Sequence, residues 1–157
     1  MAKGRSSSQV NESSETSCHC QTNMSVPTRS LSPIDVNLID IANAVINSNS
    51  TSNIHFVASA ALAHDGQIFT GVNVRHFTGS ACAELVVIGT AAARAGPSVE
   101  LVRIVAVANR KVINPCGRCR QVLRDLHPTI RVIVQENEKP VTVSIDDLLP
   151  YPYNRMD

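Results

Sequence analysis

The segment Leu101–Ala108 constrains the fold more than any other part of the chain. It reads LVRIVAVA, an apolar run interrupted by a single arginine. A strand that is apolar on both sides has to be covered on both faces, so we expect it in the middle of a sheet between two layers. The chain has 157 residues, 43% of them hydrophobic, which suffices for one domain with its own core.

Helical and extended patterns alternate around this strand. A helix start is indicated at Ser32-Pro33, a hairpin turn at Asp65-Gly66 and a helix end at Gly96-Pro97. We therefore expect helices over about 33–46, 81–95, 117–126 and from 145, and strands over 56–63, 67–74, 101–108, 130–135 and 141–143. This order predicts an α/β fold, a three-layer α/β/α sandwich with a mixed five-stranded sheet.

The first 30 residues differ in composition from the rest of the chain. They are rich in Ser, Thr, Asn and Gln and have almost no large apolar side chain before Val26. We predict a disordered extension over 1–30 and a folded domain over 31–157. The tract Cys18-His19-Cys20 lies in this extension. Its one-residue spacing and the lack of a second ligand pair nearby would make an incomplete metal site, so we interpret it as incidental.

Overall composition excludes several classes of function. The formal net charge is +1 and the chain has no Trp, which argues against nucleic-acid binding. The sequence has no apolar run of the roughly 20 residues that cross a bilayer and no signal-type segment, so we expect a cytoplasmic protein that does not enter membranes. The odd count of five cysteines, closely spaced, favours metal binding over a disulfide framework.

Three cysteines fall at the starts of two predicted helices. Cys116 and Cys119 form a C-x-x-C motif, which by itself indicates either a redox pair or half of a zinc site. Together with Cys82 they give three thiolates and an open fourth position, which is how catalytic zinc is held. The positive ends of both helix dipoles would favour thiolates there. A redox pair would leave Cys82 unexplained, and we therefore predict one bound Zn²⁺.

An acidic residue, Glu84, follows Cys82 by two positions. Taken alone it is a common first-turn helix acid, but beside a metal ligand it can act as the catalytic proton shuttle. Cys82-Ala83-Glu84 followed by Pro115-Cys116-Gly117-Arg118-Cys119 matches the signature of zinc deaminases. Three thiolates on Zn²⁺ leave a net negative charge. The guanidinium of Arg118 or of Arg120 could donate a hydrogen bond to a ligand sulfur from outside the ligand set, and we expect this of Arg118.

With these motifs and the stretches VASAAL, CAELVV, PCGRCRQVL and DLHP, the chain resembles the cytidine deaminase superfamily, and within it the blasticidin S deaminases. The matching stretches run from about Val57 to Pro150. The resemblance implies a zinc-dependent hydrolase, a homotetramer with active sites at subunit junctions, that converts a cytosine ring to uracil. The implied substrate is blasticidin S or a related aminonucleoside antibiotic. The alternatives are cytidine or deoxycytidine in pyrimidine salvage, and a zinc module without catalysis.

The resemblance also implies substrate-binding residues. Phe56 stands where a ring packs against the pyrimidine, although a core aromatic is the alternative, and Asn73 matches a ribose-binding Asn. Arg75 replaces the ribose-binding Glu, and its cation could pair with the carboxylate on the sugar of blasticidin S. Arg110 and Tyr153 match substrate-contacting positions, with a loop charge and a frayed end as the alternatives.

Overall fold

The computed structural model describes residues 26–49 and 51–154. The elements, in chain order, are α1 (Pro33–Asn47), β1 (Ala58–Ala63), β2 (Ile68–Val72), α2 (Ala83–Ala95), β3 (Leu101–Ala108), β4 (Lys111–Ile113), α3 (Gly117–Leu126), β5 (Arg131–Glu136), β6 (Lys139–Ser144) and α4 (Ile145–Leu148). The predicted helices and strands are all present, with some ends shifted by a few residues.

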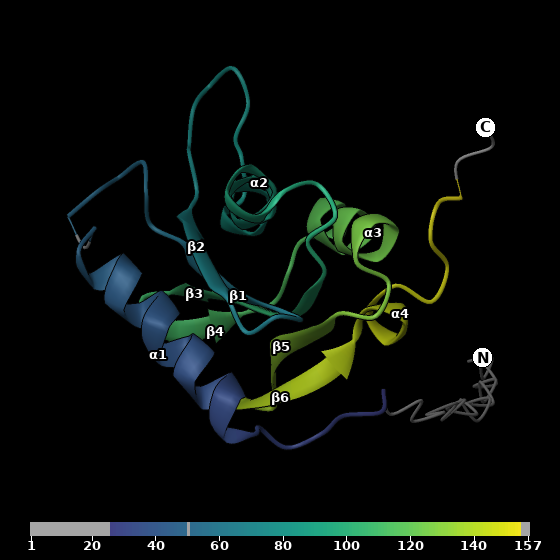
Figure 1. Ribbon diagram of the computed structural model, residues 1–157. Helices are drawn as coiled ribbons and strands as arrows, with labels where there is room; N and C mark the ends of the chain where they lie inside the picture. Colours follow the sequence, from purple (N-terminus) through teal and green to yellow (C-terminus); the bar gives the residue numbers. More distant parts are fainter. Residues whose placement is uncertain (1–25, 50, 155–157) are drawn as a thin grey trace, which may run out of the picture.

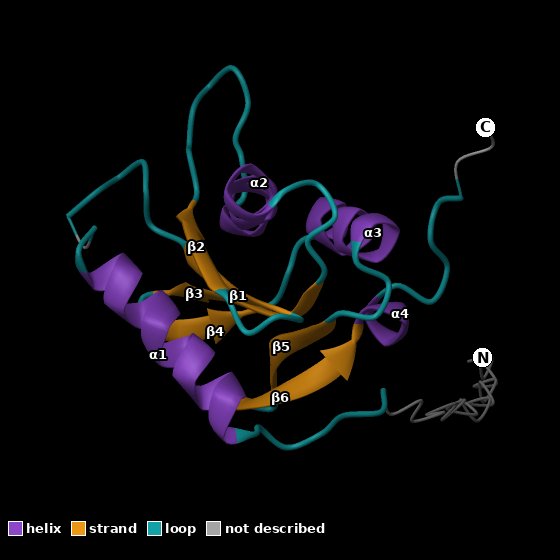
Figure 2. Ribbon diagram, in the orientation of Figure 1, coloured by secondary structure: helices purple, strands orange, loops and turns teal. Residues whose placement is uncertain are grey.

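The strands form one mixed sheet in the order β2-β1-β3-β5-β6, so β3 is central. β3 runs antiparallel to β1 and parallel to β5. Helix α1 lies on one face of the sheet, and α2 and α3 lie on the other (Figure 1 and Figure 2). The predicted three-layer α/β/α architecture is confirmed.

Alternate residues of β3 enter two separate cores. Ile104 packs with Val87 of α2 and Leu123 of α3 in the core beneath those helices. Its neighbour Val105 packs with Leu38 in the core beneath α1. The continuous apolar run of this strand therefore reflects burial on both faces, because successive side chains of a strand point to opposite sides.

The sheet has one more strand than the five predicted. β4 folds back onto the end of β3 and pairs Val112 with Val107. The two turn residues between them, Asn109 and Arg110, have φ values of 49° and 62°, as in the tight turns that join two adjacent antiparallel strands. The prediction missed this strand because it is three residues long and its turn has Arg where Gly is typical.

The start of α1 is anchored to the central strand. The Asp35 carboxylate accepts hydrogen bonds from the backbone N–H of Ser32 at 2.8 Å and from its hydroxyl at 2.6 Å. The other carboxylate oxygen lies 3.4 Å from Nε of Arg103 on β3. This carboxylate both caps the helix and ties it to the sheet. In the described part of the chain, every helix is too short or too polar to cross a membrane.

Most of the predicted N-terminal extension lies outside the described residues, and so does the Cys18-His19-Cys20 tract. Its last residues are described. Arg29 forms an antiparallel bridge with Thr142 of β6, with both backbone hydrogen bonds at 2.9 Å. The domain boundary at residue 30 stays a prediction.

Candidate metal centre and adjoining pocket

The three predicted metal ligands occupy the first positions of two helices. Cys82 is the N-cap of α2 and Cys116 is the N-cap of α3, both with extended backbone, and Cys119 is the third residue of α3. Helix α2 therefore begins at Ala83, two residues later than predicted. Residues three positions apart at a helix start lie on the same side of the helix, which is why Cys116 and Cys119 face the same point.

The three sulfur atoms form a compact cluster. They all lie within 4.8 Å of one another, and the Sγ atoms of Cys82 and Cys116 are 3.8 Å apart. Thiolates bound at about 2.3 Å to a tetrahedral zinc ion are roughly 3.8 Å apart, so this spacing fits zinc. Among the described residues, no other group of His, Cys, Asp and Glu side chains has the spacing of a metal site.

The electrostatics of the cluster call for a cation. Burial raises the pKa of the Cys119 thiol, and the nearby Glu84 carboxylate raises it further. Burial also tends to raise the pKa of Cys116, but hydrogen bonds from the Cys119 backbone and from the Cys119 and Cys82 thiols outweigh it, and this pKa is lowered. Burial and the nearby carboxylate thus disfavour the thiolate form of Cys119. A divalent ion would offset both effects, so the donor set fits Zn²⁺.

Glu84 is buried beside the sulfur cluster, with only 6% of its surface exposed. It is the second residue of α2 and points into the same pocket as Cys82 and Cys116. Burial raises the pKa of its carboxyl group. A buried carboxyl group with a raised pKa, close to a metal site, is suited to accepting and returning a proton.

Arg118 reaches from α3 to the start of α2. Its Nη2 donates a hydrogen bond to the Ser80 carbonyl oxygen at 2.7 Å and lies 3.8 Å from the Cys82 sulfur. The guanidinium therefore holds the loop that carries Cys82 and also places positive charge beside this thiol. The role of Arg118 as a support of the ligands stays a prediction.

A cleft of about 340 Å³ opens directly onto the sulfur cluster. The predicted residues Phe56, Asn73 and Arg75 all line it together with Glu84. The remaining lining residues are Val57, Ser80, Ala81, Cys82, Ala83, Ile113, Asn114 and Cys116. The structure thus brings three of the five predicted substrate residues into the pocket of the metal centre.

The amide of Asn73 is largely committed to the backbone. Its Oδ1 accepts hydrogen bonds from the N–H groups of Phe56 and Val57, both at 2.8 Å. Its Nδ2 donates to the Ile54 carbonyl oxygen at 3.1 Å. An amide oxygen has two lone pairs and the nitrogen two protons, so a single N–H is left for any ligand.

Arg75 lies over the face of Phe56, with its guanidinium carbon 5.9 Å from the ring centroid. Within the described residues it forms no salt bridge. The aromatic face stabilises the cation and keeps it at the mouth of the pocket. Arg75 therefore provides a positive charge that no described acidic side chain neutralises.

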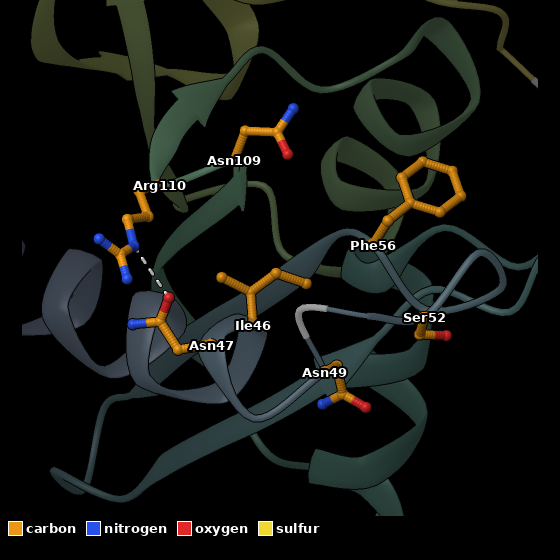
Figure 3. Close-up of a pocket in the computed structure, with 7 residues that line it drawn as sticks. All are labelled: Ile46, Asn47, Asn49, Ser52, Phe56, Asn109 and Arg110. Atoms are coloured by element: carbon orange, nitrogen blue, oxygen red, sulfur yellow. Dashed lines mark hydrogen bonds between the residues drawn. The ribbon is translucent and has the colours of Figure 1, made fainter.

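Arg110 and Tyr153 lie outside the pocket of the metal centre. Arg110 lines a neighbouring pocket of about 250 Å³, where its Nε donates a hydrogen bond to Oδ1 of Asn47 at 3.1 Å. Phe56 borders both pockets. In Figure 3 its ring and the side chain of Arg110 lie on opposite sides of the neighbouring pocket. Tyr153 is 75% exposed, and its backbone is hydrogen-bonded to the side chain of Gln121.

Sequence reasoning missed Asn114, which lines the pocket just before the second ligand pair. Its side chain pairs with the backbone of Gln135 on β5, accepting from N–H at 2.7 Å and donating to the carbonyl oxygen at 3.2 Å. The amide fixes the loop that leads to Cys116. Its partner is 21 residues away, so no local pattern could have indicated this role.

Comparisons with known proteins agree with this site. The family model described as the cytidine and deoxycytidylate deaminase zinc-binding region matches residues 34–136. A blasticidin-S deaminase from Bacillus cereus is 30% identical over 139 residues, covering 82% of this chain and 98% of the relative. A cytidine deaminase from Mycobacterium tuberculosis is 34% identical over 100 residues, covering 60% and 69% of the two chains.

Solved structures of cytidine deaminases have the same fold. That of Mycobacterium tuberculosis has a TM-score of 0.63 at 28% identity, and covers 76% of this chain and 97% of its own. That of Mycobacterium leprae has a TM-score of 0.62 at 31% identity, and covers 73% and 96%. Sequence match, fold and thiol cluster agree, and the chain belongs to the zinc-dependent cytidine and deoxycytidylate deaminase family.

Proposed function

We propose that this deaminase removes the 4-amino group from the cytosine ring of blasticidin S or a closely related aminonucleoside antibiotic. The observation that carries this substrate choice is the unneutralised Arg75 cation in the pocket of the metal centre. The similarity to a blasticidin-S deaminase over 98% of that relative's length supports it.

Within this proposal, Cys82, Cys116 and Cys119 would hold Zn²⁺, and the bound ion would supply Lewis-acid activation of the attacking water. Glu84 takes a proton from that water as its oxygen bonds to C4, and delivers the proton to N3 of the ring. Glu84 then takes the second proton of the former water and passes it to the 4-amino group. The C4–N bond breaks, so water and cytosine give uracil and ammonia.

Substrate preference would be decided at Phe56 and Arg75. The ring of Phe56 offers an apolar face to the pyrimidine. Arg75 cannot accept hydrogen bonds from ribose hydroxyls, but its guanidinium can donate to a carboxylate on the sugar.

Arg110 and Tyr153 line no part of this pocket within one chain. They would contact substrate only from another subunit of the predicted homotetramer.

The second candidate is deamination of cytidine or deoxycytidine. The cytidine deaminase relatives and the remaining N–H of Asn73 favour it. Because a phosphate could also pair with Arg75, deoxycytidylate is a useful third substrate to test.

Ultraviolet absorbance of the zinc-loaded protein distinguishes these substrates, since conversion of cytosine to uracil changes the spectrum. We expect fast turnover of blasticidin S and slow turnover of cytidine and deoxycytidylate. Preference for cytidine would establish the salvage function instead. Preference for deoxycytidylate would mean that Arg75 pairs with the phosphate of the substrate.

Substitution of Arg75 tests its role in this preference. Arg75→Glu should lower kcat/KM for blasticidin S by about 10- to 100-fold, because one charge-assisted hydrogen bond is replaced by repulsion, and should raise the value for cytidine. Arg94 is a matched control, because its guanidinium carbon lies 6.0 Å from the ring centroid of Phe69, outside the pocket. An unchanged substrate ratio in Arg75→Glu, equal to that of Arg94→Glu, would exclude the role of Arg75.

A further inference from the structure

The β1–β2 ladder changes its hydrogen bonding where it reaches the pocket. Ala58 pairs with Val72, so the antiparallel register places Val57 opposite Asn73. The Asn73 N–H donates to the Val57 carbonyl oxygen at 2.9 Å, as in a regular ladder. In a regular pair the Val57 N–H would return a bond to the Asn73 carbonyl oxygen. Here it donates to the Asn73 side chain instead.

A histidine takes the place of the missing donor. Nδ1 of His55 lies 2.6 Å from the Asn73 carbonyl oxygen and must carry a proton to bond to it. Two side chains have thus replaced one backbone hydrogen bond: the Asn73 amide holds the N–H of Val57, and the His55 imidazole holds the carbonyl oxygen of Asn73. The regular strand pairing can therefore end here while the Val57 N–H and the Asn73 carbonyl oxygen both keep a hydrogen-bond partner.

Side-chain hydrogen bonds also hold the residues just before Val57. The Ser52 hydroxyl oxygen accepts hydrogen bonds from the N–H groups of Ile54 at 3.2 Å and His55 at 2.8 Å. The Ile54 carbonyl oxygen accepts from Arg75 N–H at 3.2 Å as well as from the Asn73 side chain. Residues 54–57 are therefore fixed against 73–75 mainly by side-chain hydrogen bonds.

Phe56 lies in the middle of this segment and is 42% exposed. It borders both the pocket of the metal centre and the pocket that contains Arg110, so its position sets the division between them. Its ring also supports Arg75. We name Phe56, Asn73 and Arg75 the substrate wall. The backbone position of this wall depends on the hydrogen bonds made by the side chains of Asn73 and His55. Of these two side chains, Asn73 lines the pocket and His55 does not.

We propose that His55 is a positioning residue for substrate specificity. Its imidazole fixes the end of β2 against residues 54–57 and thereby places Phe56 and Arg75 toward the substrate. This inference rests on the proposed function for the identity of the substrate. His55 does not line the pocket of the metal centre, so its effect passes through the substrate wall.

The test compares three substitutions of His55. The side-chain nitrogen of Asn lies at the same bond distance from the backbone as Nδ1 of His, whereas that of Gln lies one bond farther. His55→Leu should raise KM for the preferred substrate about tenfold and change kcat less than about threefold, in line with the loss of one hydrogen bond. His55→Asn should restore KM, and His55→Gln should not.

Two further measurements separate positioning from general damage. Zinc content and melting temperature are recorded for each variant, and the imidazole ¹⁵N resonances of the wild type should show His55 protonated at Nδ1. Equal KM values in His55→Leu, His55→Asn and the wild type would overturn the proposal. So would an Asn variant no better than the Leu variant when both retain zinc and fold. Failure of the wild type to deaminate blasticidin S would overturn the proposed substrate instead, and the KM comparison would then use whichever cytosine compound is turned over.

Discussion

The metal centre and the substrate wall share one pocket, but they are built in different ways. The sulfur ligands sit on the first residues of α2 and α3, and two of them are only three residues apart. The wall is fixed by hydrogen bonds between residues 16 to 19 positions apart, such as that from His55 to Asn73. Each half of the metal centre is thus built locally at one helix start, although Cys82 and Cys116 are 34 residues apart and meet only because α2 and α3 lie on the same face of the sheet (Figure 1). We expect substitutions in the wall to change substrate preference and to leave the ligands in place.

The largest effect is expected from a substitution that removes the proton shuttle and leaves the substrate wall intact. Glu84→Gln should retain zinc and lower kcat about 10²- to 10⁴-fold for every cytosine substrate, because an amide cannot take a proton from the attacking water. Metal analysis and steady-state kinetics measure the two quantities. If the variant kept turnover within tenfold of the wild type, the proton-shuttle role of Glu84 would be wrong.

A smaller effect is expected from weakening the support of the ligands. Arg118→Ala should lower zinc affinity about 10- to 100-fold, because the Cys82 thiolate and its loop lose their cationic partner. Competition with a chelator measures the affinity. Arg124 is the matched control, since it lies on the same helix and its Nε lies 3.4 Å from a carboxylate oxygen of Asp146, away from the ligands and their loops. Equal zinc affinities for Arg118→Ala and Arg124→Ala would contradict the prediction.

The smallest of these three effects concerns the wall alone. Phe56→Ala should raise KM about tenfold through loss of the ring face, while zinc affinity and melting temperature stay near those of the wild type. Phe77→Ala is the control, because Phe77 is 94% exposed and does not line the pocket. A fall in zinc content of Phe56→Ala would show that wall and metal centre are coupled, contrary to the separation described above.

Sequence patterns predicted well the features that depend on neighbouring residues. The helix start at Ser32-Pro33 was found because a capping serine, a first-turn proline and an acidic residue lie close together in the sequence. The burial of Leu101–Ala108 on both faces followed from its apolar run. β4 was missed because three residues with an atypical turn give no periodic signal.

The substrate residues show the limit of the same reasoning. Phe56 and Arg75 do line the pocket, but Arg110 belongs to a neighbouring one, in a turn whose direction depends on β3 and β4 pairing. The resemblance assigned Asn73 to ribose, whereas three of its hydrogen-bonding sites are used by the backbone of residues 54–57. Those partners come together only when β1 and β2 pair.

The sequence by itself determined the α/β architecture and the chemical identity of the centre. Within each helix start the spacing is local: Glu84 stays beside Cys82, and Cys119 beside Cys116, in any fold that forms those helices. Only the tertiary structure decided that the Cys82 sulfur lies 3.8 Å from that of Cys116 and within 4.8 Å of that of Cys119. It also decided that the side chains of His55 and Asn73 replace a backbone hydrogen bond at the pocket. The physical reason is range: helix capping acts within a few residues, whereas these contacts depend on the packing of helices and strands far apart in the chain.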